Sequence, residues 1–308
     1  MPGAYAHLTL VSELATSPSL EKANFPTPAI VSVLDNLQFT DMGAVSPDYP
    51  YLKLASSADA KWADLMHHER TGDMIKAGIE LVRDMADRPR AKAFAWLLGY
   101  AAHVGTDVTI HPVVQRKVGP YVGNERAHRV CELNQDAHIF QRLDVGPIGA
   151  AEYLKSGIWR CCDQPDSGRI DPAVASVWDR MFQRCYPQEY AANRPGIDAW
   201  HRAFETVVNL AEESAAMPAF ARHLGVNAGW TYPAVAEIDK QYIENLDTPQ
   251  GKLHYDQVFD KAKANVLGLW SVIAAGVFQD DMTYLTRIGN WDLDTGEDAN
   301  RHLALWGD

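Results

Sequence analysis

A long apolar helical segment that carries three metal-ligand side chains at four-residue spacing is the strongest constraint on the fold of this chain. Residues 89–111 have apolar side chains at three- and four-residue intervals, which predicts a helix. His103, Asp107 and His111 lie in this segment and fall within about 80° of one another on an ideal helix. A buried helix must satisfy such polar groups, and coordination of a shared metal ion is a common solution. The segment therefore predicts a core helix with a metal site on one face.

A second pair of ligand-type side chains repeats this spacing further along the chain. His128 and Glu132 are again four residues apart, in a segment that Asn124 is suited to cap as a helix. One such pair alone is weak evidence, because a histidine and an acid at this spacing often form an exposed ion pair. Two sets with mixed imidazole and carboxylate donors favour zinc, and an open zinc site supports hydrolysis.

Three upstream features add candidate residues for the same site. His7 lies near the N-terminus, and Asp48 lies between prolines in AVSPDYPY, where it can present a carboxylate or simply begin a turn. His67 and His68 are adjacent in KWADLMHHERTGDMI, and either of them has the chemistry of a ligand.

The remaining pattern is helical almost throughout, and no run alternates well enough to predict a strand, so we expect an all-α fold. Pro112 biases His111 out of helical geometry, so the central helix should end there. The ligand-type histidines precede residue 140, which favours a zinc-binding core over 1–145 and a helical region over 146–308, packed on it as scaffold or wall. Further helices are expected over residues 5–15, 28–39, 58–86, 172–185, 197–224, 233–245 and 253–279.

Composition indicates a large globular chain and disfavours some classes of binding partner. The 308 residues are 47% hydrophobic, and the net charge of −12 disfavours tight binding to nucleic-acid phosphates or strongly anionic membranes. No segment has the uninterrupted apolar length of a transmembrane helix, and the N-terminus lacks a Sec-type leader. We therefore expect a protein that is cytoplasmic when synthesised, with any export through a signal-peptide-independent system. The four cysteines match no disulfide framework, so reduced thiols are expected.

One apparent motif in the second half fails on inspection. Residues 290–298 (NWDLDTGED) are similar to a calcium loop, but the position that needs glycine holds Thr295 and the distal glutamate is absent. No nucleophile elbow, phosphate-binding loop or dinucleotide fingerprint is present. The metal pattern is therefore the main functional signal.

In their order along the chain, these motifs resemble the bacterial zinc-dependent phospholipase C family, whose fold is shared with single-strand-specific zinc nucleases. The resemblance covers residues 3–140 and includes the phrases GAYAHLTL, WADLMHHERTGD and AWLLGYAAHVGTDVTIHPV. It implies a multi-helix bundle of the zinc-dependent phospholipase C type, with additional C-terminal helices and two or three zinc ions.

The resemblance also implies roles for individual residues. Asp48 would match the family's loop aspartate, which orients or deprotonates the attacking water. Of the adjacent histidines, His67 is the better match. Two departures are visible: secreted members use the amino group of an N-terminal tryptophan where this chain begins Met-Pro, and the Asp107-to-His111 interval is shorter here. The implied ligands are His67, His103 and Asp107 for one zinc, His111, His128 and Glu132 for a second, and His7 with a bridging Asp107 for a third.

The implied reaction is the hydrolysis of a glycerophospholipid to diacylglycerol and a phosphorylated head group, during transient contact with a membrane surface. Two alternatives stay open. The same centre can act on a nucleic acid or nucleotide, although the acidic balance makes this less favourable. Alternatively, the metal only stabilises the fold of a helical lipid-binding protein that catalyses no reaction. The sequence does not fix the head group, the occupancy of the third zinc site or the oligomeric state.

Overall fold

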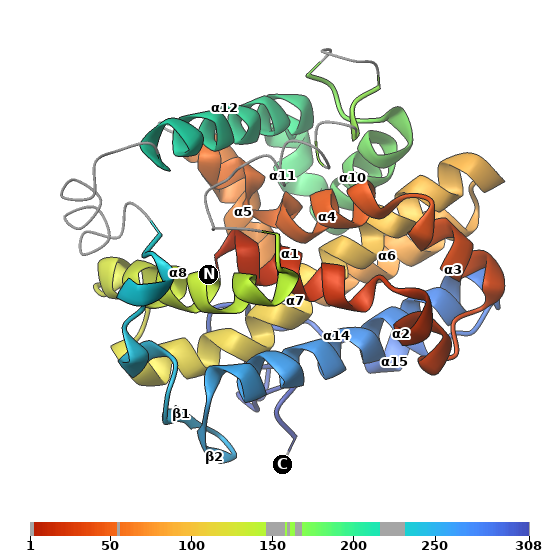
Figure 1. Ribbon diagram of the computed structural model, residues 1–308. Helices are drawn as coiled ribbons and strands as arrows, with labels where there is room; N and C mark the ends of the chain where they lie inside the picture. Colours follow the sequence, from red (N-terminus) through yellow and green to blue (C-terminus); the bar gives the residue numbers. More distant parts are fainter. Residues whose placement is uncertain are drawn as a thin grey trace.

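Helix α7 (Asp87–Val118) runs through the centre of the molecule, and the other long helices pack around it (Figure 1). Every side chain from Ala93 to Val114 is buried, so this helix is enclosed on all sides. The computed structural model describes residues 3–53, 56–145, 158, 161–163, 168–215 and 232–307, with backbone only for 207–215. These residues are mostly helical, and the predicted all-α class is confirmed.

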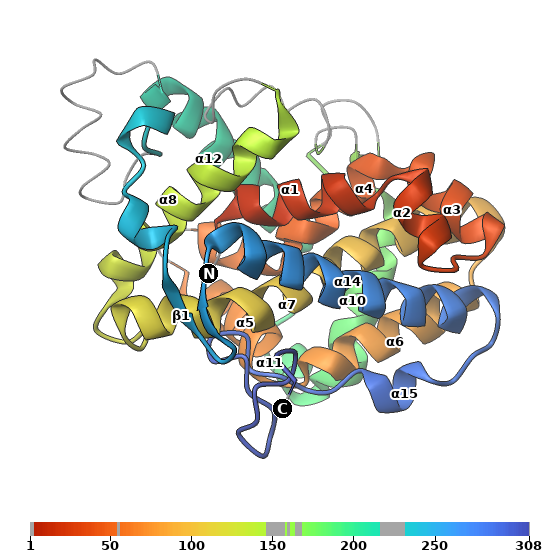
Figure 2. The same ribbon diagram turned by 60° about the horizontal axis from the view of Figure 1, so that its bottom comes forward.

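The helices around α7 come from both halves of the chain. Helix α14 (Tyr255–Phe278) lies against α7 and also contacts α1 (Ala4–Leu14), as Figure 2 shows. Among the described residues, none of the helices combines the length and hydrophobicity needed to cross a bilayer. The other helices are α2 (Ser17–Lys22), α3 (Thr27–Leu34), α4 (Leu37–Val45), α5 (Ser57–His68), α6 (Thr71–Arg83), α8 (Glu125–Ile139), α10 (Pro172–Cys185), α11 (Pro187–Ala192), α12 (Ile197–Ala215) and α15 (Tyr284–Arg287).

Two glycines allow α4 and α7 to cross in backbone contact. A Cβ atom added to Gly43 would lie 2.1 Å from the carbonyl oxygen of Trp96, and one added to Gly99 would lie 2.0 Å from that of Thr40. Only glycine permits an approach this close. The crossing is therefore a fixed point of the core, and it lies one helical turn from His103.

The predicted end of the central helix at His111 is wrong. Helix α7 continues through Pro112 to Val118 and ends before Gly119, whose φ is 92°. Proline removes the hydrogen bond to the carbonyl of Val108, four residues earlier. The C-terminal segment packs against this carbonyl, because a Cβ atom added to Gly296 would lie 2.5 Å from its oxygen. Burial on all sides holds the helix together where the local preference predicts a break.

Two other predicted helices are each divided in the structure. The segment 28–39 forms α3 and α4, and 58–86 forms α5 and α6. Arg70 has a φ of 52°, which breaks the second segment, and the hydroxyl of Tyr186 donates to the carbonyl of Glu69 at 2.5 Å. A tertiary hydrogen bond thus satisfies the end of α5, and hydrophobic spacing gives no sign of it.

The chain from residue 232 differs most from the sequence predictions. In place of a helix over 233–245 there are the 3-10 turns η4 (Val235–Glu237) and η5 (Lys240–Tyr242), followed by a hairpin of β1 (Leu246–Thr248) and β2 (Gly251–Leu253). Asp239 accepts a hydrogen bond from Gln241 N at 3.0 Å, and such a local bond competes with helix formation. The expectation of no strand is therefore wrong for this hairpin. The helices predicted over 172–185 and 253–279 are confirmed, and residues 216–224 of another lie outside the described residues.

Candidate metal centre

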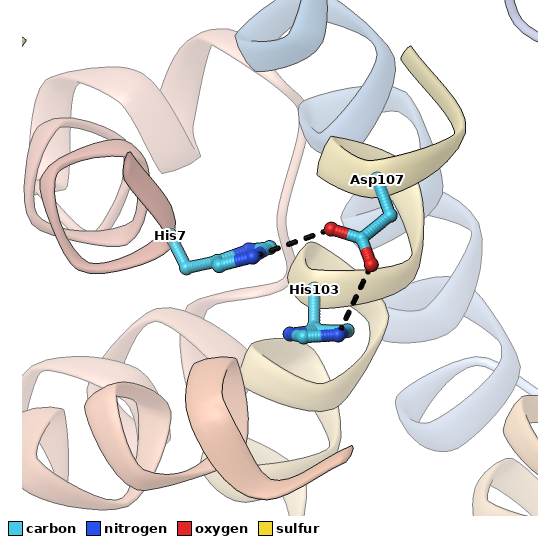
Figure 3. Close-up of side chains that lie close together, drawn as sticks. All are labelled: His7, His103 and Asp107. Atoms are coloured by element: carbon cyan, nitrogen blue, oxygen red, sulfur yellow. Dashed lines mark ion pairs between the residues drawn. The ribbon is translucent and has the colours of Figure 1, made fainter. Parts of the chain in front are cut away.

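The carboxylate of Asp107 lies between two histidines from different helices (Figure 3). Its Oδ1 atom is 3.2 Å from Nε2 of His7 on α1, and its Oδ2 atom is 3.3 Å from Nε2 of His103 on α7. The two imidazole rings are stacked, with 4.2 Å between centroids and 14° between planes. All three residues are fully buried. One carboxylate therefore faces a histidine with each of its oxygens.

Two further residues complete this group, which we call the inner cluster (His7, Asp48, His67, His103 and Asp107). Nε2 of His67 lies 3.4 Å from Nε2 of His103 and 3.3 Å from Oδ1 of Asp48. His67 lies in the last turn of helix α5, whereas Asp48 lies on the 3-10 helix η1 (Ser46–Leu52). Zinc bound by nitrogen and oxygen at about 2.0–2.1 Å holds its ligand atoms about 3.3–3.5 Å apart at the tetrahedral angle. The 3.2–3.4 Å separations of the inner cluster are close to that spacing, whereas His103 to Asp48 at 3.7 Å and His67 to Asp107 at 4.0 Å are longer.

Backbone carbonyls set the orientation of the two central imidazoles. The Nδ1 atom of His67 donates to the carbonyl of Ala63 at 2.7 Å, and the Nδ1 atom of His103 donates to that of Ala44 at 2.9 Å. A carbonyl only accepts, so each Nδ1 carries a hydrogen, and in the neutral imidazole Nε2 is then the atom with a lone pair for the cluster. The close crossing of α4 and α7 brings the carbonyl of Ala44 to His103.

The remaining predicted ligands form the outer cluster (His111, His128 and Glu132). Nδ1 of His128 is 3.8 Å from Oε1 of Glu132, and its Nε2 donates to the carbonyl of Gly119 at 2.7 Å. Nδ1 of His111 donates to the carbonyl of Leu293 at 2.5 Å. His111 and Glu132 are close enough for each to affect the pKa of the other. The 3.8 Å separation of His128 and Glu132 is longer than the 3.2–3.4 Å separations of the inner cluster.

Several buried polar atoms at both clusters lack a hydrogen bond. Their presence there is a test of whether the residues suit a metal ion. An unpaired buried polar atom typically costs about 1–3 kcal/mol, so such a concentration indicates a ligand from outside the chain. Imidazole and carboxylate are donors that zinc accepts, and the residues therefore fit the ion. Within the described residues, the atoms without a hydrogen bond include both ring nitrogens of His7, Oδ1 of Asp48, both carboxylate oxygens of Asp107, Nε2 of His111 and Nδ1 of His128.

The inner cluster is strongly coupled electrostatically. Burial opposes charge on His103, but the carboxylates of Asp107 and Asp48 raise its pKa to about 9. Burial likewise opposes charge on Asp107, yet His103 and His111 hold the pKa of this carboxyl well below its usual value. The metal-free cluster thus keeps an imidazolium beside a carboxylate at pH 7, and a bound cation replaces the proton.

The structure places the seven predicted ligands and Asp48 in these two clusters. It also separates the two adjacent histidines. His67 is 1% exposed and faces the inner cluster, whereas the side chain of His68 is 36% exposed and its Nδ1 lies 2.9 Å from Asp292. That the seven predicted ligands coordinate a metal stays a prediction, as does the catalytic role of Asp48.

The sequence prediction missed the contribution of residues 291–294. The backbone N–H of Leu293 donates to the carbonyl of His67 at 2.8 Å, while its own carbonyl accepts from His111. Gln115 Nε2 donates to the carbonyl of Asp294 at 2.7 Å. This stretch lies in the rejected calcium loop, and its contribution is mainly through backbone atoms, which side-chain spacing does not reveal. It supports one histidine of each cluster.

The fold and these clusters together define an all-α protein with a candidate imidazole–carboxylate metal centre. The family model described as zinc dependent phospholipase C matches residues 6–187, more than half of the chain. The chain therefore belongs to the zinc-dependent phospholipase C family, and the resemblance is confirmed. This membership supports zinc dependence and a hydrolase function of the phospholipase C type in general. Comparison with curated proteins and with solved structures gave no match. The matched region contains both clusters but ends before residues 291–294.

Proposed function

We propose that the protein hydrolyses a glycerophospholipid between glycerol and phosphate, releasing diacylglycerol and a phosphorylated head group. One observation carries the proposal: in a chain of this family, His67, His103 and Asp107 direct buried donor atoms at one point, with separations of 3.3, 3.4 and 4.0 Å that a small shift of Asp107 would bring to the spacing of a zinc site. The net charge of −12 favours a lipid over a nucleic acid as the source of the phosphodiester.

The donor atoms suggest how two or three zinc ions are shared. Nε2 of His67, Nε2 of His103 and Oδ2 of Asp107 would hold one ion. Oδ1 of Asp107 and Nε2 of His7 face a second position, so Asp107 would act as the bridge. The outer cluster would hold a further ion through His111, His128 and Glu132.

Asp48 is suited to handle the proton of the attacking water. When bound, zinc in such a site neutralises phosphate oxygens and lowers the pKa of a nearby water. The Asp48 side chain is 18% exposed, whereas Asp107 is fully buried, so solvent reaches only the first of these carboxylates. Burial opposes ionisation of Asp48, but His103 and His67 hold its pKa below the usual value, so it is a carboxylate at pH 7.

The reaction then balances without an additional reactant. Asp48 accepts a hydrogen bond from the water and orients it toward phosphorus. The water oxygen forms a bond to phosphorus, the bond between phosphorus and the glycerol oxygen breaks, and the water proton passes through Asp48 to the departing alkoxide. Asp107 and Glu132 stay ionised throughout, because their task is to bind the cations.

The decisive experiment compares substrates and one pair of variants. A phosphatidylcholine analogue and single-stranded DNA are assayed side by side with metal-depleted and zinc-reloaded protein, and we expect turnover of the lipid only, after reloading. Asp48→Asn should lower kcat by about 10²–10⁴-fold with unchanged zinc content. Asp35→Asn, at an exposed position on the end of α3, is the matched control and should keep full activity.

Each contrary result has a defined meaning. Full activity of Asp48→Asn would remove the proton-transfer role, and a parallel loss of zinc would make Asp48 a ligand. Turnover of DNA in place of the lipid would support the nuclease alternative. A zinc content near zero after gentle purification would contradict the metal centre itself.

A loop beside the outer cluster offers a contact for the membrane surface. Between α7 and α8, Tyr121 is 39% exposed and Val122 is 86% exposed, and the ring of Tyr121 lies 5.2 Å from that of His128. We expect Val122→Asp to lower turnover of vesicles several-fold while leaving turnover of a soluble short-chain lipid unchanged, because only the first requires apolar contact. Val31→Asp on α3, 51% exposed, is the control, and an equal loss in both variants would contradict this contact.

A further inference from the structure

A third group of ligand-type side chains lies outside the two clusters. Sγ of Cys162 is 3.5 Å from Nε2 of His201, and Oε1 of Glu205 is 3.7 Å from the same nitrogen. Each of these donor atoms lies within 4.8 Å of the other two. His201 and Glu205 occupy successive turns of α12, whereas Cys162 forms an isolated β-bridge with Ile170. Two segments remote in sequence thus bring a thiol, an imidazole and a carboxylate together.

The arrangement differs from a nucleophilic triad. In a Cys–His–acid triad, the acid binds the ring nitrogen opposite the one that faces the sulfur. Here the sulfur and the carboxylate oxygen both approach Nε2 of His201. Three donor atoms that converge in this way leave a position between them where a cation can bind all three.

The spacing agrees with tetrahedral zinc coordination. A Zn–S bond of about 2.3 Å and a Zn–N bond of about 2.1 Å put sulfur and nitrogen about 3.6 Å apart, and nitrogen and oxygen ligands about 3.4 Å apart. The observed separations at His201 are 3.5 Å to Cys162 and 3.7 Å to Glu205. Only a small movement of Glu205 is needed to reach an ion, and its side chain is 20% exposed.

A buried tyrosine beside this group gives a second, independent indication. The hydroxyl of Tyr49 is fully buried and forms no hydrogen bond within the part of the chain that the structure describes. Its ring lies 5.8 Å from the ring of His201 and stacks on Phe204 at 4.7 Å. Burial, and to a lesser degree Cys161, Glu205 and Cys162, raises the pKa of Tyr49. An unshared polar group at this position is available to a ligand or to its bound water.

We propose that Cys162, His201 and Glu205 form a further binding site for a divalent cation such as Zn²⁺, separate from the inner and outer clusters. The thiolate gives it a softer donor set than those clusters, which contain only nitrogen and oxygen ligands. One coordination position is left for water. The ion would join α12 to the segment that contains Cys162, next to η1, because the ring of Tyr49 on η1 lies against that of His201. This proposal does not depend on the proposed function.

The sulfur-to-cobalt charge-transfer band of bound Co²⁺ reports on this site alone, because the other two clusters have no sulfur ligand. The full-length protein is stripped of metal with a chelator, kept reduced and titrated with Co²⁺. We expect a sulfur-to-cobalt charge-transfer band in the near ultraviolet, in addition to the visible bands of cobalt at the other clusters. Cys162→Ser should lose this band completely and bind one Co²⁺ fewer per chain, while its circular dichroism stays that of the parent protein.

Two control variants make the outcome decisive. Cys131→Ser and Cys185→Ser remove other free thiols that belong to no such group among the described residues, and both should keep the band. His201→Gln provides a second removal of the site and should also lose it. If the parent protein binds Co²⁺ without the band, or if the band survives in Cys162→Ser, the proposal is wrong. If the band is lost in Cys131→Ser or Cys185→Ser, the site lies elsewhere.

Discussion

The inner and outer clusters use the same kinds of donor, but the inner donors are held closer together. In the inner cluster, Asp107 lies 3.2 Å and 3.3 Å from its two histidines, whereas in the outer cluster His128 is 3.8 Å from Glu132. The inner donors project from helices and from η1 within the core. The outer donors depend also on the loop between α7 and α8 and on the carbonyl of Leu293. A metal site thus gains preorganisation from the elements that support its ligands, and we expect tighter binding at the inner cluster.

Removal of the bridging carboxylate should separate the two clusters most clearly. In Asp107→Asn, the inner cluster loses the anionic group that faces both His7 and His103, so its zinc affinity should fall by more than about 100-fold. Glu132→Gln should weaken only the outer cluster. Zinc competition with a chromophoric chelator measures both. Equal losses at both clusters in Asp107→Asn would show that they do not bind independently.

The pH dependence of zinc affinity should also differ between the clusters. The pKa of His103 is raised to about 9, so binding at the inner cluster displaces a proton at pH 7. Affinity should therefore rise about 10-fold per pH unit from pH 7 and level off near pH 9. Burial lowers the pKa of His111 to about 4, so this imidazole is already neutral and adds no such slope.

Two variants allow the pH dependence of zinc affinity to be measured separately for each cluster. Glu132→Gln reports the inner cluster and Asp107→Asn the outer one, each titrated at several pH values. A flat profile between pH 7 and 9 for Glu132→Gln would mean that His103 is already neutral in the metal-free protein.

A smaller change is expected when the C-terminal support is loosened. Gln115→Ala removes the hydrogen bond to the carbonyl of Asp294, next to the residue that orients His111. Loss of such an outer contact should lower zinc affinity at the outer cluster by about 10-fold. Arg116→Ala, at the neighbouring exposed position, is the control. An effect confined to the inner cluster would contradict the role given to residues 291–294.

The smallest effect is expected at the second of the adjacent histidines. His68→Ala removes a partly exposed contact with Asp292 and should change zinc affinity by less than about twofold. His67→Ala should instead abolish binding at the inner cluster. Similar losses in the two variants would mean that either histidine can serve as the ligand.

The sequence predicted the side chains of the centre better than the backbone that holds them. His103 and Asp107 are recognisable because their spacing of four matches the helical repeat in an apolar segment. The continuation of α7 through Pro112 was not predictable from local preference, since tertiary packing overrides it there. The carbonyl of Leu293 has no sequence signature at all. The domain boundary near residue 145 and the cellular location stay predictions.

The group around Cys162 shows a further limit of prediction from sequence. Cys162 and His201 are 39 positions apart and share no motif, so only the fold brings them together. The absence of a disulfide framework predicted reduced thiols, and the four cysteines are free. Spacing rules identify ligands on one helix, whereas ligands from separate elements become visible only in three dimensions.

The metal centre depends on the absence of a side chain at Gly43 and Gly99, where α4 and α7 cross. Alanine at position 43 or 99 would push the two helices apart and draw the carbonyl of Ala44 away from the imidazole of His103. That ring would then lose the hydrogen bond that fixes its orientation toward the cluster. A glycine-to-alanine substitution in the hydrophobic interior would therefore weaken metal retention, although every predicted ligand and Asp48 would still be present.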